Sequence, residues 1–250
     1  MARGPRWRVD QERVSIRFSP AAIREAQGRV RVSAFTGCPT PPPERYDAHM
    51  STTDANRMFQ RQTQRADHAA DWLRHLDLRA GERCADVGSG PGYFSLILAE
   101  RVGPTGVVYA IDRSPEALAY LAEEMQVRGV ANIQTVHGDA AAVDLPSGPA
   151  DAAVVAMMLH HTSDPAGVLR NVARLLRPGG RAVVAEFHPE GTGEHGAPLS
   201  MRLPPEAVRA WCEAAGLEVR AEERTSPEHY LLSLRLRPPS GHTSPAGAHR

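Results

Sequence analysis

The sequence predicts an α/β fold in which helices cover both faces of a largely parallel sheet. Short apolar runs alternate with amphipathic segments from about residue 83 to residue 216, and such alternation is typical of βαβ units. The run Ala152–Leu159 has eight consecutive apolar residues, as expected of a strand that is buried on both faces. The glycine-rich stretch Asp86–Gly92 separates a predicted strand from a predicted helix, which places a ligand crevice at that edge of the sheet.

The elements can be placed in order along the chain. A helix is expected over about Asp54–Leu76, with a mostly apolar stripe toward the sheet and a polar start that lies over the crevice as a lid. Strands are expected at Arg83–Val87, at Val107–Ile111, between Ile133 and Asp139, from Asp151 onward, after Arg181, and at Leu217–Ala221 and Tyr230–Leu236. The last two are joined by a polar turn that contains Pro227.

The helices between these strands carry start and stop signals. Tyr93–Val102 follows the glycine-rich stretch and has an amphipathic pattern. Ser114-Pro115-Glu116 begins the next helix, with a capping hydroxyl, a proline in the first turn and an acid at the positive end of the helix dipole. The remaining boundaries are Gly129, which ends that helix, Asp164-Pro165, which begins another, Pro178 and the glycines at 179–180, which end it, and Pro205–Ala215, a last helix before Gly216.

Three glycines, Gly88, Gly90 and Gly92, lie at the first strand-to-helix turn. Glycine tolerates both a positive φ and the close approach of a ligand to the backbone. The dinucleotide-binding pattern G-x-G-x-x-G needs its third glycine one residue later, where this chain has Tyr93. A nucleoside without a pyrophosphate therefore suits the turn better. Asp112 comes directly after the second predicted strand, at the place where a ribose lies in such folds.

The order of these motifs resembles that of the class I S-adenosylmethionine-dependent methyltransferases. The first motif of that family is an acid followed by G-x-G-x-G, and its next strand ends in a second acid; here these are Asp86–Gly92 and Asp112. The resemblance extends over about Asp54–Leu236. It implies a Rossmann-like α/β fold, with a seven-stranded and mostly parallel sheet, helices on both faces and an antiparallel C-terminal hairpin, and it implies S-adenosyl-L-methionine as the methyl donor.

The resemblance also assigns roles to individual residues. In the family, the acid matched by Asp86 helps to hold the methionine amino group, and the acid matched by Asp112 binds the ribose. Asp139 matches an acid that faces the adenine amino group, beside the main chain of Ala140. The cofactor-binding residues implied in this way are Asp86, Gly88, Gly90, Gly92, Asp112, Arg113, Asp139, Ala140 and Met157.

Each acid also has a purely structural interpretation. Asp86 can be a strand-end acid that accepts hydrogen bonds from nearby backbone amides, and Asp139 can begin a turn with Gly138. Asp112 can cap a helix, but Ser114 already fills the capping position, which favours the ribose role.

The candidates for a general base are histidines that follow the fourth and fifth predicted strands. Imidazole titrates near neutral pH and can take a proton from an acceptor hydroxyl or amine. His161 is the first candidate and His188 the second. His160, Glu186, Glu194 and His195 lie nearby in the sequence, but an adjacent pair of histidines projects in divergent directions from an extended backbone. No metal site is therefore expected.

The function that follows is transfer of a methyl group from S-adenosylmethionine to a small-molecule acceptor by in-line displacement. The segments 187–203 and Glu228–Leu232 resemble a bacterial branch that acts on small molecules and is related to quinone-pathway enzymes. The chain lacks the Asn-Pro-Pro-Tyr or Asp-Pro-Pro-Tyr motif of enzymes that methylate amino groups of nucleic acids. Two alternatives stay open: an NAD(P)-dependent oxidoreductase, and an S-adenosylmethionine-binding protein without catalytic activity.

Composition excludes several other classes. The 250 residues include 29 basic and 29 acidic side chains, so the average charge does not favour a nucleic-acid partner. Every basic residue is arginine, which excludes lysine Schiff-base chemistry. Cys38, Cys84 and Cys212 are far apart and fit no paired metal-ligand spacing. No apolar run approaches the roughly 20 residues that span a bilayer, and we expect a cytoplasmic protein. The sequence carries no signal for the oligomeric state.

Three regions are expected along the chain. Residues 1–45 are rich in arginine and proline and are predicted to be a flexible extension, with a basic arm that contacts phosphate or membrane as the alternative. Residues 46–237 form the predicted methyltransferase domain. Residues 238–250 are rich in proline, glycine, serine and histidine and are predicted to be a disordered tail. Met50 precedes the first folded pattern, and we hypothesise that translation can start there.

Overall fold

The computed structural model of the chain describes residues 51–63, 66–194 and 196–238. The predicted extension over residues 1–45, Met50, His195 and the predicted tail from residue 239 lie outside the described residues. The three predicted regions therefore remain predictions.

Seven strands form one sheet in the order β3-β2-β1-β4-β5-β7-β6. Neighbours from β3 to β5 are parallel, whereas β7 runs antiparallel to both β5 and β6. This arrangement confirms the predicted fold class, including the antiparallel C-terminal hairpin. The strands are β1 Arg83–Val87, β2 Val107–Asp112, β3 Ile133–His137, β4 Ala150–Ala156, β5 Leu176–Phe187, β6 Leu217–Arg224 and β7 His229–Leu236.

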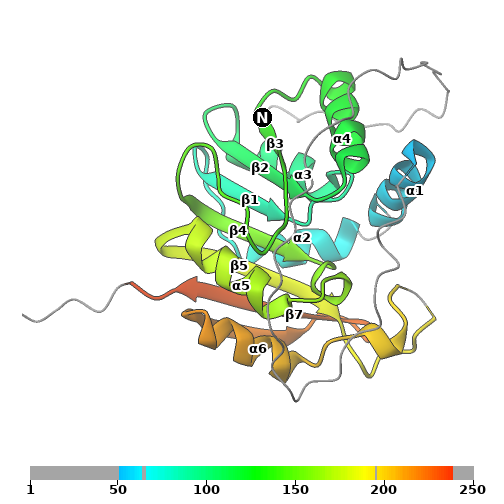
Figure 1. The fold of residues 1–250 in the computed structure, drawn as a ribbon, viewed down its shortest axis with the longest axis vertical. Helices are drawn as coiled ribbons and strands as arrows, with labels where there is room; N and C mark the ends of the chain where they lie inside the picture. Colours follow the sequence, from blue (N-terminus) through cyan, green and yellow to red (C-terminus); the bar gives the residue numbers. More distant parts are fainter. Residues whose placement is uncertain (1–50, 64–65, 195, 239–250) are drawn as a thin grey trace, which may run out of the picture. The chain divides into compact units, whose positions relative to one another are not determined.

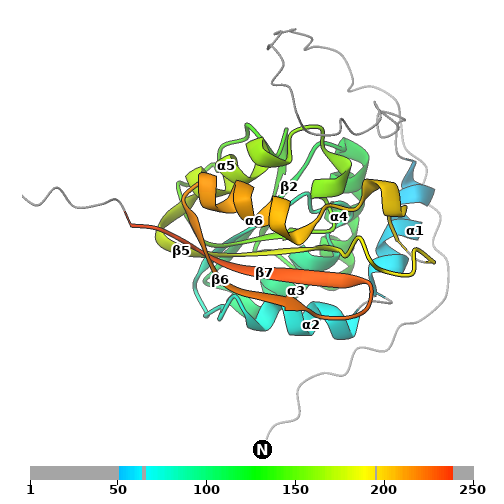
Figure 2. The ribbon, with the colours of Figure 1, turned by 90° about the horizontal axis from the view of Figure 1, so that it is seen from below.

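Helices pack on both faces of the sheet (Figures 1 and 2). On one face, α2, α3 and α4 contribute to an apolar cluster around Trp72, Leu98 and Leu121. On the other face, α5 and α6 contribute to a second cluster around Leu169 and Cys212. The helices are α1 Thr52–Thr63, α2 Ala66–Arg74, α3 Tyr93–Val102, α4 Pro115–Arg128, α5 Pro165–Leu175 and α6 Pro205–Ala214, with short 3₁₀ helices η1 Leu159–His161 and η2 Leu199–Met201.

The side chains of β4 point alternately into the two apolar clusters. Ala152 and Val154 join the cluster on the α2–α3 face, whereas Ala153 and Val155 join the cluster on the α5–α6 face. Successive side chains of a strand point to opposite faces, so only a nearly continuous apolar run fills both. The chain then leaves β4 at the carboxyl edge of the sheet, where β1, β2 and β5 also end.

The single helix predicted over Asp54–Leu76 is wrong, because the structure has two separate helices there, α1 and α2. The segment 60–65 consists only of polar residues, so no apolar stripe runs continuously through it. The two helices bury their side chains against different partners. Phe59 of α1 lies 5.7 Å from the ring of Tyr120 on α4, whereas Trp72 of α2 stacks on Phe94 of α3 at 6.0 Å.

The turn before β5 also differs in detail from the expected one. Helix α5 ends at Leu175, three residues before Pro178, which was expected to end it. Leu176 pairs with Ala150, and the next pair is Arg181 with Ala152, so the pairing register shifts between them. Gly179 has a φ of +74°, which supports the expected reversal at the paired glycines.

No helix in the described ranges is long and apolar enough to cross a membrane.

Candidate functional site

The glycine turn joins β1 to α3 at the carboxyl edge of the sheet. Gly88, Gly90 and Gly92 all have a positive φ, of +74°, +53° and +88°. A Cβ at Gly92 would lie 2.2 Å from Cδ1 of Leu121, and a Cβ at Gly88 would lie 2.8 Å from Cβ of Met158. Side chains are therefore excluded both by the backbone conformation and by the neighbours.

Asp112 connects the glycine turn to the end of β2. Its Oδ2 accepts a hydrogen bond from Gly90 N–H at 2.7 Å, and its Oδ1 accepts one from Ser114 N–H at 2.8 Å. Ser114 in turn caps α4, because its hydroxyl accepts from Ala117 N–H at 3.1 Å. The capping role that competed with ribose binding is thus filled by Ser114, and each oxygen of Asp112 keeps a second lone pair for a ligand.

Asp86 lies under the glycine turn and is only 2% exposed. The hydroxyl of Ser95, on the first turn of α3, donates to its Oδ2 at 2.6 Å. Burial raises the pKa of Asp86 to about 7, and the nearby carboxylate of Asp112 adds to this effect. A buried acid with such a pKa favours a cationic ligand, which fits the methionine amino group and sulfonium of S-adenosylmethionine.

Asp139 and Ala140 lie in the turn after β3. The Oδ1 of Asp139 accepts from Ala141 N–H at 2.8 Å, so this exposed acid has the turn-forming role that the sequence left open. The carbonyl of Ala140 accepts from Nδ2 of the buried Asn171 at 2.9 Å. Arg113 is exposed, and its carbonyl oxygen lies 3.1 Å from Nε2 of His137. The adenine-binding roles of Asp139 and Ala140, and the cofactor role of Arg113, stay predictions.

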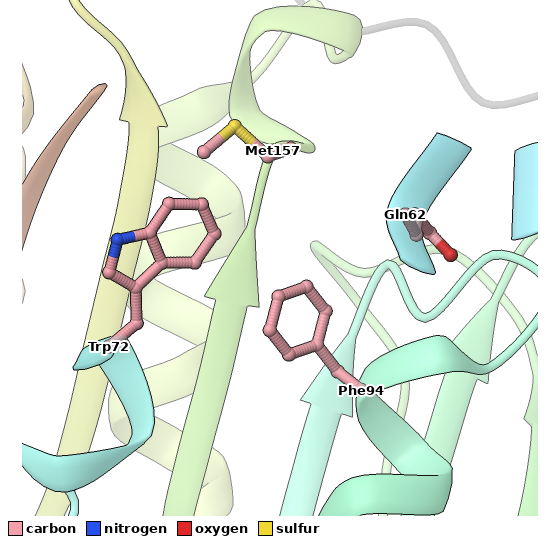
Figure 3. Close-up of a pocket in the computed structure, with 4 residues that line it drawn as sticks. All are labelled: Gln62, Trp72, Phe94 and Met157. Carbon is pink, nitrogen blue, oxygen red and sulfur yellow. The ribbon is translucent and has the colours of Figure 1, made fainter. Parts of the chain in front are cut away.

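Met157 lines a small cavity on the α2–α3 face of the sheet, together with Gln62, Trp72 and Phe94 (Figure 3). Its φ of +55° is unusual for a residue other than glycine, and such strain often marks a functional position. The cavity volume is about 20 Å³, enough for a single water molecule. The Oε1 atom of Gln62 is buried and has no hydrogen-bond partner within the described part of the chain.

Helix α1 lies over the glycine turn. A Cβ at Gly90 would lie 3.2 Å from Sδ of Met58 and 3.9 Å from Nε2 of Gln62, and both of these side chains come from α1. Gln62 thus contacts the turn on one side and the cavity on the other. A ligand that occupies both places requires α1 or its side chains to move.

The histidines after β4 differ sharply from each other. The Nδ1 atom of His160 lies 2.6 Å from Oε2 of Glu186, and both side chains are buried. His161 is half-buried, and its ring centroid lies 4.0 Å from that of His160. Burial lowers the pKa of His161 to about 3, with smaller contributions from His160 and Arg113. The role of His161 as a base is untested and stays a prediction.

His188 lies in the loop after β5, and Arg202 holds that loop by hydrogen bonds. Nη1 of Arg202 donates to the carbonyl of His188 at 2.9 Å and to Oε2 of Glu228 at 2.7 Å. Hydrogen bonds from Thr192 and Arg202 lower the pKa of Glu228 to about 2. The imidazole of His188 packs edge-on against Tyr230 at 6.0 Å. Its proposed role as a base is likewise a prediction.

Several residues of the site were not predicted from the sequence. Gln62, Trp72, Phe94 and Ser95 acquire their roles only through neighbours that are distant in sequence. Trp72, for example, donates its indole N–H to Thr225 Oγ1 at 3.1 Å, across 153 positions of the chain. Within the described ranges, no group of three or more His, Cys, Asp and Glu side chains is placed to hold a metal ion.

Comparisons with known proteins point to the same family. A family model described as a methyltransferase domain matches residues 85–184. A demethylmenaquinone methyltransferase of Geobacillus kaustophilus is 32% identical over 116 residues, which are 46% of this chain and 50% of that protein. An uncharacterised 37.1 kDa protein of a Streptomyces fradiae transposon is 35% identical over 167 residues, 65% of this chain and 44% of that protein. The chain thus matches about half the length of these curated relatives.

A solved structure shows the same fold. The S-adenosylmethionine-dependent methyltransferase of Aquifex aeolicus superimposes with a TM-score of 0.68 and 22% identity, over 74% of this chain and 98% of that one. The matched segment 85–184 contains the glycine turn, Asp112 and Met157. Residues 85–184 therefore match a methyltransferase domain, and the chain has the fold of an S-adenosylmethionine-dependent methyltransferase.

Proposed function

We propose that the protein transfers the methyl group of S-adenosylmethionine to a small-molecule acceptor by in-line displacement at the methyl carbon. The observation that carries this proposal is the glycine turn tied to the end of β2 by the Gly90–Asp112 hydrogen bond of 2.7 Å. It supplies a backbone cradle and an acid at the adjacent strand end, as a nucleoside requires.

Electrostatics favour this donor over a nicotinamide dinucleotide. Two carboxyl groups, Asp86 and Asp112, flank the turn, and the second raises the pKa of the first. A pyrophosphate placed at this turn would lie beside the buried Asp86, whereas the ammonium group of the methionine moiety would neutralise that carboxylate. The oxidoreductase alternative is therefore disfavoured.

The protein contributes mainly geometry to such a reaction. Orientation of two reactants can lower a barrier by about 7–11 kcal/mol, and proton transfer to a base adds about 10²- to 10⁴-fold in rate. In this proposal the glycine turn and its acids hold the donor. Helix α1 covers the turn and excludes water, and the space at Met157 receives the acceptor beside the methyl group once α1 or its side chains have moved.

The proposed acceptor is a small molecule of the kind used by quinone-pathway enzymes. Support comes from the relatives named demethylmenaquinone methyltransferases, which match over 116 residues. The aromatic side chains Trp72 and Phe94 in the cavity wall suit a flat ring. We also propose that the protein is a cytoplasmic enzyme. Because the formal net charge of the chain is zero, we propose that it has no nucleic-acid partner.

Calorimetry tests the donor site first. S-adenosylhomocysteine should bind with micromolar or better affinity, and NADH and NADPH should give no heat at the same concentrations. Folded protein that fails to bind S-adenosylhomocysteine contradicts the proposal.

A second assay tests turnover. Formation of S-adenosylhomocysteine is measured with a panel of hydroquinones, phenols, amines and nucleic acids. We expect turnover with at least one ring hydroxyl compound and none with nucleic acid. Binding of the donor without turnover on any member of the panel favours the alternative of a binding protein without catalytic activity.

A further inference from the structure

The buried side chain of Asn171 joins helix α5 to the turn after β3. Asn171 is 3% exposed. Its Nδ2 donates to the carbonyl of Ala140 at 2.9 Å and to the carbonyl of Val143 at 3.0 Å. These two residues are 31 and 28 positions away in the sequence. One side chain therefore holds the turn on which the predicted adenine-binding residues lie.

The orientation of the Asn171 amide is fixed by Arg174, which lies nearly one helical turn later on α5. Nε and Nη2 of Arg174 donate to Oδ1 of Asn171 at 2.9 Å and 2.6 Å. A side-chain amide has two donor hydrogens and one oxygen with two lone pairs, so Asn171 makes all of its hydrogen bonds. A reversed amide would place its oxygen against two carbonyl oxygens. The amide therefore has a single favourable orientation.

Asn171 contributes more to this connection than Arg174 does. Nη2 of Arg174 also donates to the carbonyl of Val143 at 2.8 Å, and its Nη1 pairs with Asp144. The side chains of that ion pair are 50% and 80% exposed, and exposed ion pairs contribute little to stability. Loss of Asn171, in contrast, would leave the half-buried carbonyl of Ala140 without its partner.

The turn held by Asn171 adjoins the proposed donor half. Gly138 N–H donates to the carbonyl of Asp112 at 3.0 Å, and β3 lies beside β2 in the sheet. The carboxyl ends of β1, β2 and β3 are thus followed by Asp86, Asp112 and Asp139 in that order. Neighbouring strands are about 4.8 Å apart. A donor with its amino group at the first acid and its ribose at the second therefore has its base at the turn after β3.

The hydrogen-bonding groups of this turn match one edge of adenine. The Asp139 carbonyl accepts from the N–H groups of Ala142 and Val143, each at 2.9 Å. The N–H of Ala140 has no hydrogen-bond partner within the described part of the chain. It is a donor beside the carboxylate of Asp139, which is an acceptor. Adenine has the complementary pair on its Watson–Crick edge, a ring nitrogen that accepts beside an amino group that donates.

The peptide unit between Ala140 and Ala141 connects Asn171 to these groups. Asn171 holds the carbonyl of that unit, and Oδ1 of Asp139 accepts from its N–H at 2.8 Å. A peptide unit is planar, so fixing its carbonyl also fixes the direction of its N–H. The position of the Asp139 carboxylate and the orientation of the backbone at Ala140 both follow from it.

We propose that Asn171 positions the turn after β3 for adenine and thereby determines the base specificity of the donor site. This inference rests on the proposed function. Asn171 does not contact the donor itself, because both of its donor hydrogens and its oxygen are already used. It acts through the turn, as a positioning residue.

Calorimetry with two ligands tests the inference. S-inosylhomocysteine differs from S-adenosylhomocysteine only in its base, where an oxo group replaces the amino group and the adjacent ring nitrogen carries a hydrogen. Donor and acceptor are thus exchanged on that edge. A site that hydrogen-bonds its ligand rejects an analogue that leaves its polar groups unpaired, so the wild-type protein should prefer S-adenosylhomocysteine about thirtyfold or more.

Asn171→Ala should reduce this preference. It should weaken binding of S-adenosylhomocysteine about tenfold and binding of S-inosylhomocysteine less than about twofold, because the displaced turn no longer matches adenine. The preference should therefore fall about fivefold or more. A general loss of stability would weaken both ligands alike, so the ratio of the two affinities separates positioning from a purely structural role.

Asn132→Ala is the matched control. Asn132 directly precedes β3, and its Nδ2 donates to two carbonyls, those of Ala99 and Gly103, each at 2.9 Å. It thus makes the same kind of connection as Asn171, but at the opposite end of β3, away from the proposed donor half. Urea unfolding should show that both variants lose stability. Asn132→Ala should leave the preference between the two ligands unchanged.

Asn171→Asp replaces the alanine variant if that variant does not fold. It keeps the size of the side chain and the pairing with Arg174, but it presents an oxygen to the carbonyl of Ala140, and it should reduce the preference to a similar extent. Three results overturn the inference: an unchanged preference in a folded Asn171 variant, an equal fall in Asn132→Ala, or no preference in the wild-type protein. The proposed function survives each of them. Folded wild-type protein that binds neither ligand contradicts the proposed function, and the inference with it.

Discussion

The donor half and the acceptor half of the site are built in different ways. Most of the proposed donor half comes from one continuous stretch, Asp86–Ser114, whose hydrogen bonds are mostly made by backbone amides at the glycine turn. The predicted donor contacts of Asp139, Ala140 and Met157 lie outside this stretch. The proposed acceptor half comes from side chains at four separate places: Gln62 of α1, Trp72 of α2, Phe94 of α3 and Met157 after β4. A donor shared by many enzymes can be held by backbone, whereas each acceptor needs its own side chains.

The two buried acids show the same difference. Asp86 in the donor half has a hydroxyl group as its partner, from Ser95 at 2.6 Å, and its pKa is raised to about 7. Glu186 at the end of β5 has an imidazole and a backbone amide as its partners. Asp86 therefore has no cationic partner among the described residues, and the proposed donor can supply one. Glu186 already lies beside the imidazole of His160, which becomes a cation when it takes up a proton.

The largest effect is expected from Gly92→Ala. The added Cβ meets Leu121 Cδ1 at 2.2 Å and forces alanine into a φ of +88°. Backbone strain and overpacking each cost about 1–3 kcal/mol, so the free energy of unfolding should fall by about 2–6 kcal/mol. Urea unfolding measures that loss, and calorimetry should show that binding of S-adenosylhomocysteine is lost as well.

Gly129→Ala is the matched control for this change. Gly129 ends α4 with a φ of +66°, but a Cβ there meets nothing within 4 Å. Gly129→Ala should lower the free energy of unfolding only through backbone strain, by about 1–2 kcal/mol. It should leave the affinity for S-adenosylhomocysteine unchanged. Equal losses of stability and binding in the two variants would show that contact with Leu121 is not what constrains the turn.

Asp112→Ala should have the next largest effect. It removes a carboxylate that holds Gly90 N–H and Ser114 N–H and that is predicted to bind the ribose. Hydrogen bonds to charged groups contribute about 1.5–3 kcal/mol, so S-adenosylhomocysteine should bind about ten- to a hundredfold more weakly in calorimetry. Asp139→Ala, which alters an exposed turn acid, should weaken binding by less than about fivefold. Unchanged affinity in Asp112→Ala contradicts its assignment.

Most of the donor half could be predicted from the sequence because its signals are local. The predicted strand Arg83–Val87 and helix Tyr93–Val102 have the same bounds as β1 and α3, since an apolar run and a helical period are complete within each segment. The edge strand β6 extends to Arg224, beyond the predicted Ala221. Its outer residues are largely exposed, so burial leaves little trace of this part in the sequence.

The acceptor half could not be predicted in the same way. Gln62 lies within a polar run, and only the fold places it between the glycine turn and the cavity. His160 and His161 look equivalent in the sequence, yet it is His160 whose Nδ1 lies 2.6 Å from Glu186, which is 26 positions away. Pairings of this kind depend on strand order, which no local pattern encodes.

The pH dependence of donor binding tests the role of Asp86. Its pKa of about 7 in the free protein lies above the usual value near 3.9, and a bound cation should lower it again. Between pH 5 and 7, binding of S-adenosylmethionine should therefore release a proton, and affinity should fall about fivefold from pH 7 to pH 6. Calorimetry in buffers of different ionisation enthalpy measures both effects.

The raised pKa of Asp86 also makes the stability of the free protein depend on pH. The direction of this dependence is opposite to that produced by a salt-bridged acid. The folded state holds the proton of Asp86 more tightly than the unfolded chain does, so this contribution is present below about pH 4 and is lost as the pH rises to about 7. Asp86→Asn should remove both dependences. A proton release that persists in Asp86→Asn would assign it to another group.

The smallest expected effect concerns Gln62, whose buried Oε1 has no hydrogen-bond partner among the described residues. Methionine has a similar volume and helix propensity but no polar atom. Gln62→Met should therefore raise the free energy of unfolding by about 1 kcal/mol, because an unsatisfied buried acceptor is removed. If this atom binds the acceptor, the KM for the acceptor should rise severalfold while donor affinity stays unchanged.

Gln60→Met on the exposed face of the same helix is the control and should change stability by less than about 0.5 kcal/mol. A loss of stability in Gln62→Met would mean that Oε1 is hydrogen-bonded in the free protein, for example to an ordered water molecule. Weaker donor binding with an unchanged KM would instead assign Gln62 to the donor half. Gln62 touches both halves, so this one substitution decides where the boundary between them lies.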